Sequence, residues 1–363
     1  IVDYIVENTV GSLCHGKTPN KVSELRILDP ACGSGSFLLG AYKYLLQWHR
    51  DYYSSQKDKK RLKDKIYQGK KGEWFLTIQE KKRILLNNIY GVDIDSQAVW
   101  VTKLSLLLKV LEGENQDALE AQQKLFKERA LPDLGDNIKC GNSLIGPDIY
   151  GAMELEPEDI RRINPFDWEN EFPQVEDGFD AVIGNPPYIR IQAMKEWAPV
   201  EVEVYKKNYF SASKGNYDIY VVFVEKGLSL LNEKGLLGYI LPHKFFNAKY
   251  GQSLRSLIAE GKNLDKVVHF GDQQVFERAT TYTCLLFLNR SPRKKFNFVK
   301  VEDLGEWKVS GEAVEGEVSA KKVTGEEWNF IVGSGAEIFE KLNEMPVKLG
   351  EITDKIFQGL VTS

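Results

Sequence analysis

Four consecutive residues suit one kind of chemistry: Asn185, Pro186, Pro187 and Tyr188. An amino nitrogen bound to an sp2 carbon is a poor nucleophile, because its lone pair is delocalised into the attached π-system. The Asn185 carboxamide oxygen and the Pro186 carbonyl oxygen can accept both N–H groups of such an amine and aim its lone pair at an electrophile. The prolines hold the backbone rigid, and the Tyr188 ring offers a stacking surface. The tetrapeptide indicates methylation of a planar amine, although Asn-Pro also simply ends many strands.

A second stretch, Ile27–Phe37, predicts a strand, a tight turn and the start of a helix. The apolar strand leads into Asp29, and a Gly-x-Gly turn at Gly33 and Gly35 follows. In a Rossmann-like sheet, small residues at the first βα turn let a ligand approach the backbone at a helix N-terminus. An acid before this turn would repel a pyrophosphate, so it suits a ligand with a cationic amino-acid end.

A second strand is predicted at Asn88–Asp93, and a helix is predicted from Ser96 to Leu111. An acid at the tip of the second strand binds ribose hydroxyls in this architecture. Side chains alternate along a strand, which favours Asp93 for that role and leaves Asp95 as the cap of the following helix.

Together these segments resemble motifs I and IV of the N6-adenine DNA methyltransferases. More narrowly, they resemble the gamma-class enzymes of type IIG restriction–modification proteins with a TaqI-like specificity domain. The resemblance continues in order along the chain: Asn137–Leu144 is similar to motif III, Asn216–Lys226 and Gly235–Pro242 to motifs V and VI, and Val275–Phe276 with Ala279–Thr283 to motif VIII.

The resemblance implies a site-specific DNA methyltransferase that moves a methyl group from S-adenosylmethionine to the N6 of an adenine flipped out of double-stranded DNA. Asn185 and Pro186 would bind the target amine, and Tyr188 and Phe276 would stack on the base. Family members often carry Asp at the position of Asn142, whose carbonyl is still an acceptor for the cofactor's amino group. The cofactor-binding residues would be Asp29, Ala31 and Gly33 for the methionine end, Asp93 for the ribose, and Ile94, Asn142 and Phe223 for the adenine.

Alternating strand and helix signals predict an α/β fold, a Rossmann-like methyltransferase with a seven-stranded, mostly parallel sheet and helices on both faces. The resemblance implies that the last strand is antiparallel and inserted beside the fifth or sixth. We expect a catalytic domain at 1–290, a bridging region at 291–345 and the start of a target-recognition domain at 346–363. The strands are expected at Arg26–Leu28, Asn88–Asp93, Ile138–Cys140, Ala181–Gly184, Leu236–Leu241, Val267–Phe270 and Tyr282–Leu288.

Two further segments stand out between these elements. Ile189–Gly215 directly follows the catalytic tetrapeptide and is rich in lysine and aromatic residues, so we expect a lid over the target base. Gln56–Gly72 is rich in lysine, which favours a solvated helical insertion over an arm that contacts phosphates.

Composition limits the function classes. The chain is 42% hydrophobic, carries a net charge of −4 and has four scattered cysteines without zinc-ligand spacing. No apolar run approaches the roughly 20 residues of a membrane span, so we expect a cytoplasmic protein with no metal. The negative net charge is unusual for a DNA-binding protein. The alternatives left open are a protein glutamine methyltransferase, an RNA N6-adenine methyltransferase and a non-catalytic DNA-recognition subunit.

Overall fold

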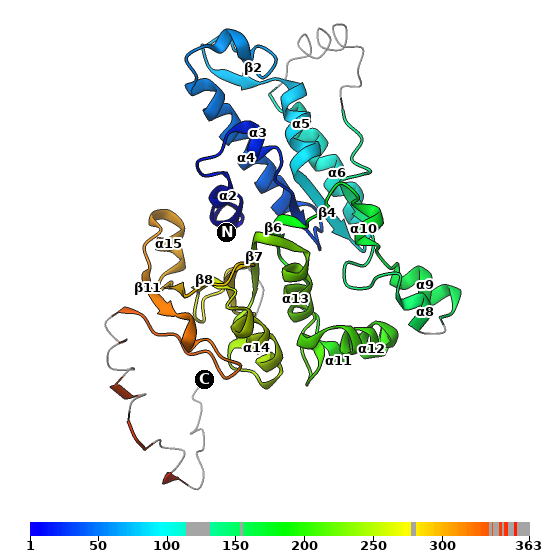
Figure 1. The fold of residues 1–363 in the computed structure, drawn as a ribbon, viewed down its shortest axis with the longest axis vertical. Helices are drawn as coiled ribbons and strands as arrows, with labels where there is room; N and C mark the ends of the chain where they lie inside the picture. Colours follow the sequence, from blue (N-terminus) through cyan, green and yellow to red (C-terminus); the bar gives the residue numbers. More distant parts are fainter. Residues whose placement is uncertain are drawn as a thin grey trace.

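The computed structural model describes residues 1–113, 131–152, 155–276 and 281–333, together with 336, 341–342, 345–347 and 352–353. Its centre is a nine-stranded sheet in the order β11-β10-β8-β9-β7-β6-β1-β4-β5 (Figure 1). Of the sequence-based expectations, Ala279, Thr280 and most of the expected recognition-domain segment at 346–363 lie outside the described residues.

All seven strands predicted from the sequence are present. β9 lies between β7 and β8 and is antiparallel to both, whereas the other neighbours among these seven strands are parallel, which confirms the expected inserted antiparallel strand. Their bounds are β1 (Ile27–Asp29), β4 (Ile89–Asp93), β5 (Ile138–Cys140), β6 (Phe179–Gly184), β7 (Leu231–Pro242), β8 (Leu264–His269) and β9 (Thr283–Asn289).

The predicted count of seven strands is wrong, because two more strands extend the sheet. β10 (Lys295–Lys300) pairs in parallel with β8, and β11 (Val314–Ser319) pairs antiparallel with β10. Phe296 and Phe298 on β10 are buried in the same core as the central strands. The sheet therefore continues past residue 290, into the region that we predict to be a bridging segment.

Helices cover both faces of the sheet, as predicted. Side chains alternate along each strand, so Ile183 of β6 packs against one helical layer and its neighbour Val182 against the other. The first layer contains α1 (Val2–Val6), α4 (Ser36–Ser55), α5 (Ile78–Asn88) and α6 (Ser96–Leu111), and the second contains α13 (Tyr220–Leu230) and α14 (Gln252–Gly261).

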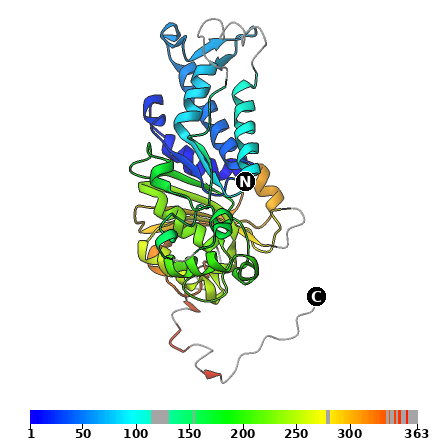
Figure 2. The ribbon, with the colours of Figure 1, turned by 90° about the vertical axis from the view of Figure 1, so that its right-hand side faces the viewer.

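The lysine-rich insertion is not the helix that we predict. It forms a 3-10 turn, η2 (Lys59–Leu62), and a hairpin of β2 (Ile66–Gln68) and β3 (Trp74–Leu76). Gly72 has a φ of +88° in the hairpin turn, a conformation that favours glycine and does not continue a helix. Figures 1 and 2 show this hairpin at the end of the molecule opposite α11 to α14.

Shorter elements connect the layers. They are η1 (Glu7–Gly11), α2 (Ser12–Cys14), α3 (Pro19–Val22), α8 (Ile149–Ala152), α9 (Pro157–Ile163), α10 (Trp168–Glu171), α11 (Ile191–Trp197), α12 (Pro199–Asn208), η3 (Phe210–Ala212), η4 (His243–Phe246), η5 (Lys249–Gly251), α15 (Leu304–Ser310) and η6 (Ala320–Lys322). Within the described parts of the chain, no helix is both long enough and apolar enough to cross a membrane.

Candidate active site

The turn after β1 has the conformation that its glycines predict. Gly33 and Gly35 adopt left-handed φ values of +52° and +84°. A Cβ atom on Gly35 would lie 2.8 Å from the Thr102 hydroxyl oxygen, so this position requires glycine on two grounds. The Thr102 hydroxyl in turn donates a 2.8 Å hydrogen bond to the Gly33 carbonyl, which holds the turn against α6.

Asp93, at the end of β4, is joined to the same turn. One carboxylate oxygen accepts a 2.7 Å hydrogen bond from the Gly33 N–H, and the other accepts a 2.9 Å bond from the Asp95 N–H. Asp95 caps α6 by accepting from the Gln97 N–H at 2.8 Å, which confirms its predicted role as a cap. The adjacent ends of β1 and β4 thus present one acid beside an exposed backbone turn.

Asp29 lies beneath this turn and is only 1% exposed. Burial raises the pKa of its carboxyl to about 8; the Ala31 N–H, which donates to it at 3.1 Å, opposes that shift. A Cβ on Gly184 would lie 2.6 Å from an Asp29 carboxylate oxygen. The backbone just before Asn185 therefore rests directly on Asp29, and the strand ends that carry the two main motifs are in contact.

A cavity of about 300 Å³ opens at these strand ends. It brings together most of the residues that the sequence assigns to the cofactor with part of the catalytic tetrapeptide. Asp29 and Gly33 do not line it, although Ala31 between them does. The predicted residues that line it are Ala31, Asp93, Ile94, Asn142, Phe223, Asn185 and Pro187.

Sequence reasoning missed the opposite wall of this cavity, which comes from α11 and α12. These helices belong to the segment that we expect to be a lid over the target base; in the structure they line the same cavity as the predicted cofactor residues. Ile191 and Met194 before Pro199, and Val202 and Tyr205 after it, are buried at helical spacing, and the proline marks the start of the second helix. The missed lining residues include Ile189, Met194, Trp197, Glu201 and Tyr205.

A second cavity, of about 550 Å³, is lined by Tyr188. Phe276, the second predicted stacking residue, lines neither cavity and is 36% exposed. Tyr282 lines the second cavity in its place, is 43% exposed, and has its ring within 10° of parallel to the His243 ring. The other residues around this cavity are Arg190, Asp218, Pro242, Lys244, Asn247, Ala248 and Thr281.

The Tyr188 hydroxyl connects the last residue of the tetrapeptide to the first, Asn185. It lies 2.5 Å from the Asn185 carboxamide oxygen and 3.1 Å from the Ile240 carbonyl oxygen, both of which can accept its proton. Burial raises the pKa of Tyr188, so the phenol stays protonated and available as a donor. The hydroxyl therefore orients the carboxamide of Asn185.

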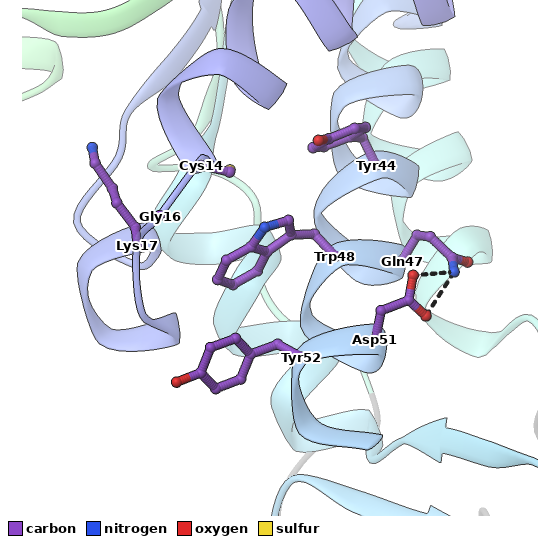
Figure 3. Close-up of a pocket in the computed structure, with 8 residues that line it drawn as sticks. All are labelled: Cys14, Gly16, Lys17, Tyr44, Gln47, Trp48, Asp51 and Tyr52. Carbon is purple, nitrogen blue, oxygen red and sulfur yellow. Dashed lines mark hydrogen bonds between the residues drawn. The ribbon is translucent and has the colours of Figure 1, made fainter. Parts of the chain in front are cut away.

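A third cavity, of about 390 Å³, lies between the loop after α2 and the outer side of α4 (Figure 3). Tyr44, Trp48 and Tyr52 of α4 line it, and the Trp48 and Tyr52 rings stack at 5.5 Å. Trp48 lies about 18 Å along the helix axis from the glycine turn, at 1.5 Å per residue. None of the predicted site residues lines this third cavity.

Elsewhere too, the described residues contain no group of three or more His, Cys, Asp or Glu side chains that could hold a metal ion.

The sequence is similar to restriction–modification proteins. The profile of the Eco57I restriction-modification methylase family matches residues 87–276, and that of N-6 DNA methylases matches residues 5–131. The type II restriction enzyme and methyltransferase RM.Eco57I of Escherichia coli is 39% identical over 307 residues, which cover 85% of this chain and 29% of that protein. A putative enzyme of the same kind from Methanocaldococcus jannaschii, RM.MjaORFECS2P, is 24% identical over 78% of this chain and 31% of its own length.

Solved structures share the fold. The type ISP enzyme LlaBIII, solved bound to DNA, superposes with a TM-score of 0.56 at 13% identity, covering 93% of this chain and 22% of that one. The cryo-EM structure of a DrdV–DNA complex gives a TM-score of 0.51 at 16% identity, over 85% of this chain and 28% of that one. This chain thus spans about a third or less of the curated relatives it matches. The family profile covers more than half of its 363 residues, and the chain belongs to the Eco57I restriction-modification methylase family.

Proposed function

We propose that this chain methylates the N6 of an adenine flipped out of double-stranded DNA, using S-adenosylmethionine, as the modification part of a type IIG restriction–modification enzyme. One observation carries the proposal: Asn185 and Pro187 line the first cavity, and Tyr188 lines the second. A single rigid tetrapeptide thus stands between a site for the methyl donor and a site for the base. The 39% identity with RM.Eco57I supports the same reaction class.

The residues around the first cavity fit S-adenosylmethionine. Ile94 and Phe223 give apolar walls for an adenine, and Asp93 is placed for a ribose. Asp29, buried without a cationic partner within hydrogen-bonding distance among the described residues, suits the cofactor's ammonium group. When bound, the cofactor supplies a methyl group on a sulfonium, whose leaving group is a neutral thioether.

The tetrapeptide would activate the target nitrogen. The Asn185 carboxamide oxygen and the Pro186 carbonyl oxygen accept the two N–H groups of the adenine and direct its lone pair toward the first cavity. Tyr188 holds the Asn185 side chain through its hydroxyl and stacks on the base through its ring. Positioning and these two acceptors supply the rate enhancement, since the reaction needs no strong base.

The second cavity would receive the flipped nucleotide. Extruding a base costs a few kcal/mol, and stacking on aromatic rings returns about 1–3 kcal/mol per base. Tyr282, rather than Phe276, offers the second ring in this cavity. Arg190 and Lys244 add positive charge to its wall, where the phosphates of an extruded nucleotide would lie.

Transfer of a labelled methyl group to different acceptors tests the proposal. The chain is incubated with radiolabelled S-adenosylmethionine and either double-stranded DNA, RNA or a glutamine-containing protein, with the Asn185→Ala variant as the matched control. We expect label in the N6 of DNA adenine with the wild-type chain and none with the variant. Label in RNA or protein alone would establish one of the rival methyltransferases. Cofactor binding without transfer to any acceptor would favour a non-catalytic recognition subunit.

A further inference from the structure

The first cavity has two walls of different chemistry. The strand-end wall contains Asp93 and Asn142, and the helical wall from α11 and α12 contains Glu201. Glu201 is only 5% exposed, on a wall that Met194, Trp197 and Tyr205 also form. A carboxylate in such an apolar setting requires hydrogen-bond donors, because burial without them is costly.

The acceptors of the strand-end wall already have partners within the protein. Both carboxylate oxygens of Asp93 accept from backbone N–H groups, at 2.7 and 2.9 Å. The Asn142 carboxamide oxygen accepts from the Leu144 N–H at 3.0 Å. Asn142 is thereby fixed in place, and it carries no charge.

Among the residues that the structure describes, Arg162 is the cation that pairs with Glu201. Arg162 of α9 lies 3.1 Å from one carboxylate oxygen and also binds Asp159, at 2.9 Å, and the Trp197 carbonyl. Its charge is therefore shared between two carboxylates. Burial raises the pKa of Glu201, and the hydrogen bond from its own backbone N–H and the nearby Arg162 guanidinium oppose that shift.

We propose that Glu201 recognises the exocyclic amino group of the cofactor's adenine and makes the site selective for adenine over a purine that carries a 6-oxo group. This inference rests on the proposed function, because it assumes that the first cavity holds S-adenosylmethionine. A carboxylate only accepts hydrogen bonds, so it attracts an amino group and repels a carbonyl oxygen in the same place. Glu201 thus supplies the charged acceptor that the resemblance leads one to expect at the position of Asn142.

Titration calorimetry with two ligands tests the proposal without any methyl transfer. S-adenosylhomocysteine and S-inosylhomocysteine differ only in the amino or oxo group at C6 and its ring tautomer. We expect the wild-type chain to prefer the adenosyl ligand by about 10- to 100-fold, the range of a charge-assisted hydrogen bond. Glu201→Gln keeps the shape of the side chain, and its amide can accept from an amino group or donate to a carbonyl.

Glu201→Gln should therefore lower the preference by about tenfold or more and bind the inosyl ligand more tightly than the wild-type chain does. A substitution that merely disrupted α11 and α12 would weaken the binding of both ligands, so it could not increase the affinity for the inosyl ligand. Glu203→Gln is the matched control, since Glu203 lies on the same helix, is exposed and pairs with Lys206; its preference should equal that of wild type. An unchanged preference in Glu201→Gln, or equal binding of both ligands by the wild-type chain, would overturn the role of Glu201. Failure of the wild-type chain to bind S-adenosylhomocysteine would instead contradict the proposed function.

Discussion

At the scale of single residues, Asp29 gives the clearest electrostatic signature. Burial raises its pKa to about 8, above the roughly 3.9 of a free aspartate. In the ligand-free chain this raised pKa contributes stability that is complete below about pH 4 and is lost as the pH rises through about 8. A bound ammonium group reverses the balance, because it favours the ionised carboxylate.

The first prediction follows from the raised pKa of Asp29. Binding of S-adenosylmethionine near pH 7 should release a proton from Asp29, and the affinity should increase as the pH rises toward 8. Calorimetry in buffers of different ionisation enthalpy measures the released proton directly. Asp29→Asn should bind more weakly and without proton release. Equal proton release by the wild-type chain and the variant would show that Asp29 is not the group that titrates.

The second prediction concerns Asn185. Asn185→Ala removes one of the two acceptors for the target amine, so methyl transfer should fall by about 100-fold or more, as for the loss of a preorganised catalytic hydrogen bond. Cofactor affinity, measured by calorimetry on the same preparation, should remain close to wild type. Loss of affinity in proportion to activity would place Asn185 in cofactor binding instead.

The third prediction separates the two contributions of Tyr188. Tyr188→Phe keeps the ring but removes the hydroxyl that lies 2.5 Å from the Asn185 oxygen, so single-turnover transfer should fall by about 5- to 10-fold. Tyr188→Ala also removes the stacking surface, worth about 1–3 kcal/mol, and should fall much further. Equal losses in the two variants would mean that the ring contributes nothing and that Tyr188 acts through its hydroxyl alone.

At the scale of secondary-structure elements, the sequence predicts most of what positions the site. β1, β4, β6 and β9 are rich in buried apolar residues, which makes their pattern clear. β5, at the edge of the sheet, and β8 also carry polar residues, such as Lys139 and Lys266. β10 is missed although Phe296 and Phe298 alternate with polar residues, because it follows a basic stretch and lies in a region that we predict to be a bridging segment. β11 is missed because its exposed edge carries Glu315 and Glu317 rather than apolar residues.

The candidate site is predictable from the sequence only in part, because some of its residues are brought together by tertiary packing. Asp93 ends β4, and Asn142 and Asn185 follow β5 and β6 within two residues. Parallel strands bring their carboxyl ends together, so sequence position alone groups these three residues. Trp197 and Glu201 reach the same cavity through packing of α11 and α12, which no local pattern specifies. Tyr282 lines the second cavity and Phe276 does not, since a motif that indicates an aromatic residue does not fix which ring faces a cavity. The stacking role of Phe276 stays a prediction.

The fourth prediction tests the turn that joins β1 to α4. Gly35→Ala should destabilise the chain by about 1–2 kcal/mol, because an L-residue at a φ of +84° is strained and its Cβ would meet Thr102. Gly151→Ala, in α8 with open space around it, is the matched control and should be neutral or slightly stabilising. Chemical denaturation measures both free energies of unfolding. An equal effect of the two substitutions would argue against a strained turn.

At the scale of the whole molecule, the strand ends lie between the two helical layers and their separate buried cores. The buried apolar residues that line the first cavity, including Leu144, Met194 and Phe223, belong to the core on the side of α13 and α14. A ligand that binds only the folded chain at this place should stabilise the fold as a whole.

The fifth prediction concerns the increase in melting temperature (Tm) that this ligand-induced stabilisation should cause. S-adenosylhomocysteine at 100 times its Kd should add about 2.7 kcal/mol to the free energy of unfolding and raise the Tm by several degrees. Asp93→Ala should weaken binding by about 1–3 kcal/mol and reduce the ligand-induced shift at the same concentration. Differential scanning fluorimetry, with and without ligand for each protein, separates this effect from any change in the ligand-free Tm. An unchanged shift in the variant would remove Asp93 from the binding site.

The contact between Gly184 and Asp29 also restricts how the chain can be re-engineered. A side chain at position 184 would overlap the Asp29 carboxylate, so the two positions do not vary independently. In a graft of residues 27–37 from another methyltransferase, a residue at position 29 larger than Asp would press on Gly184 and displace the backbone before Asn185. That displacement would move Asn185 in the wall of the first cavity. Compatibility at this one contact should thus decide which chimeras keep both a bound cofactor and a working tetrapeptide.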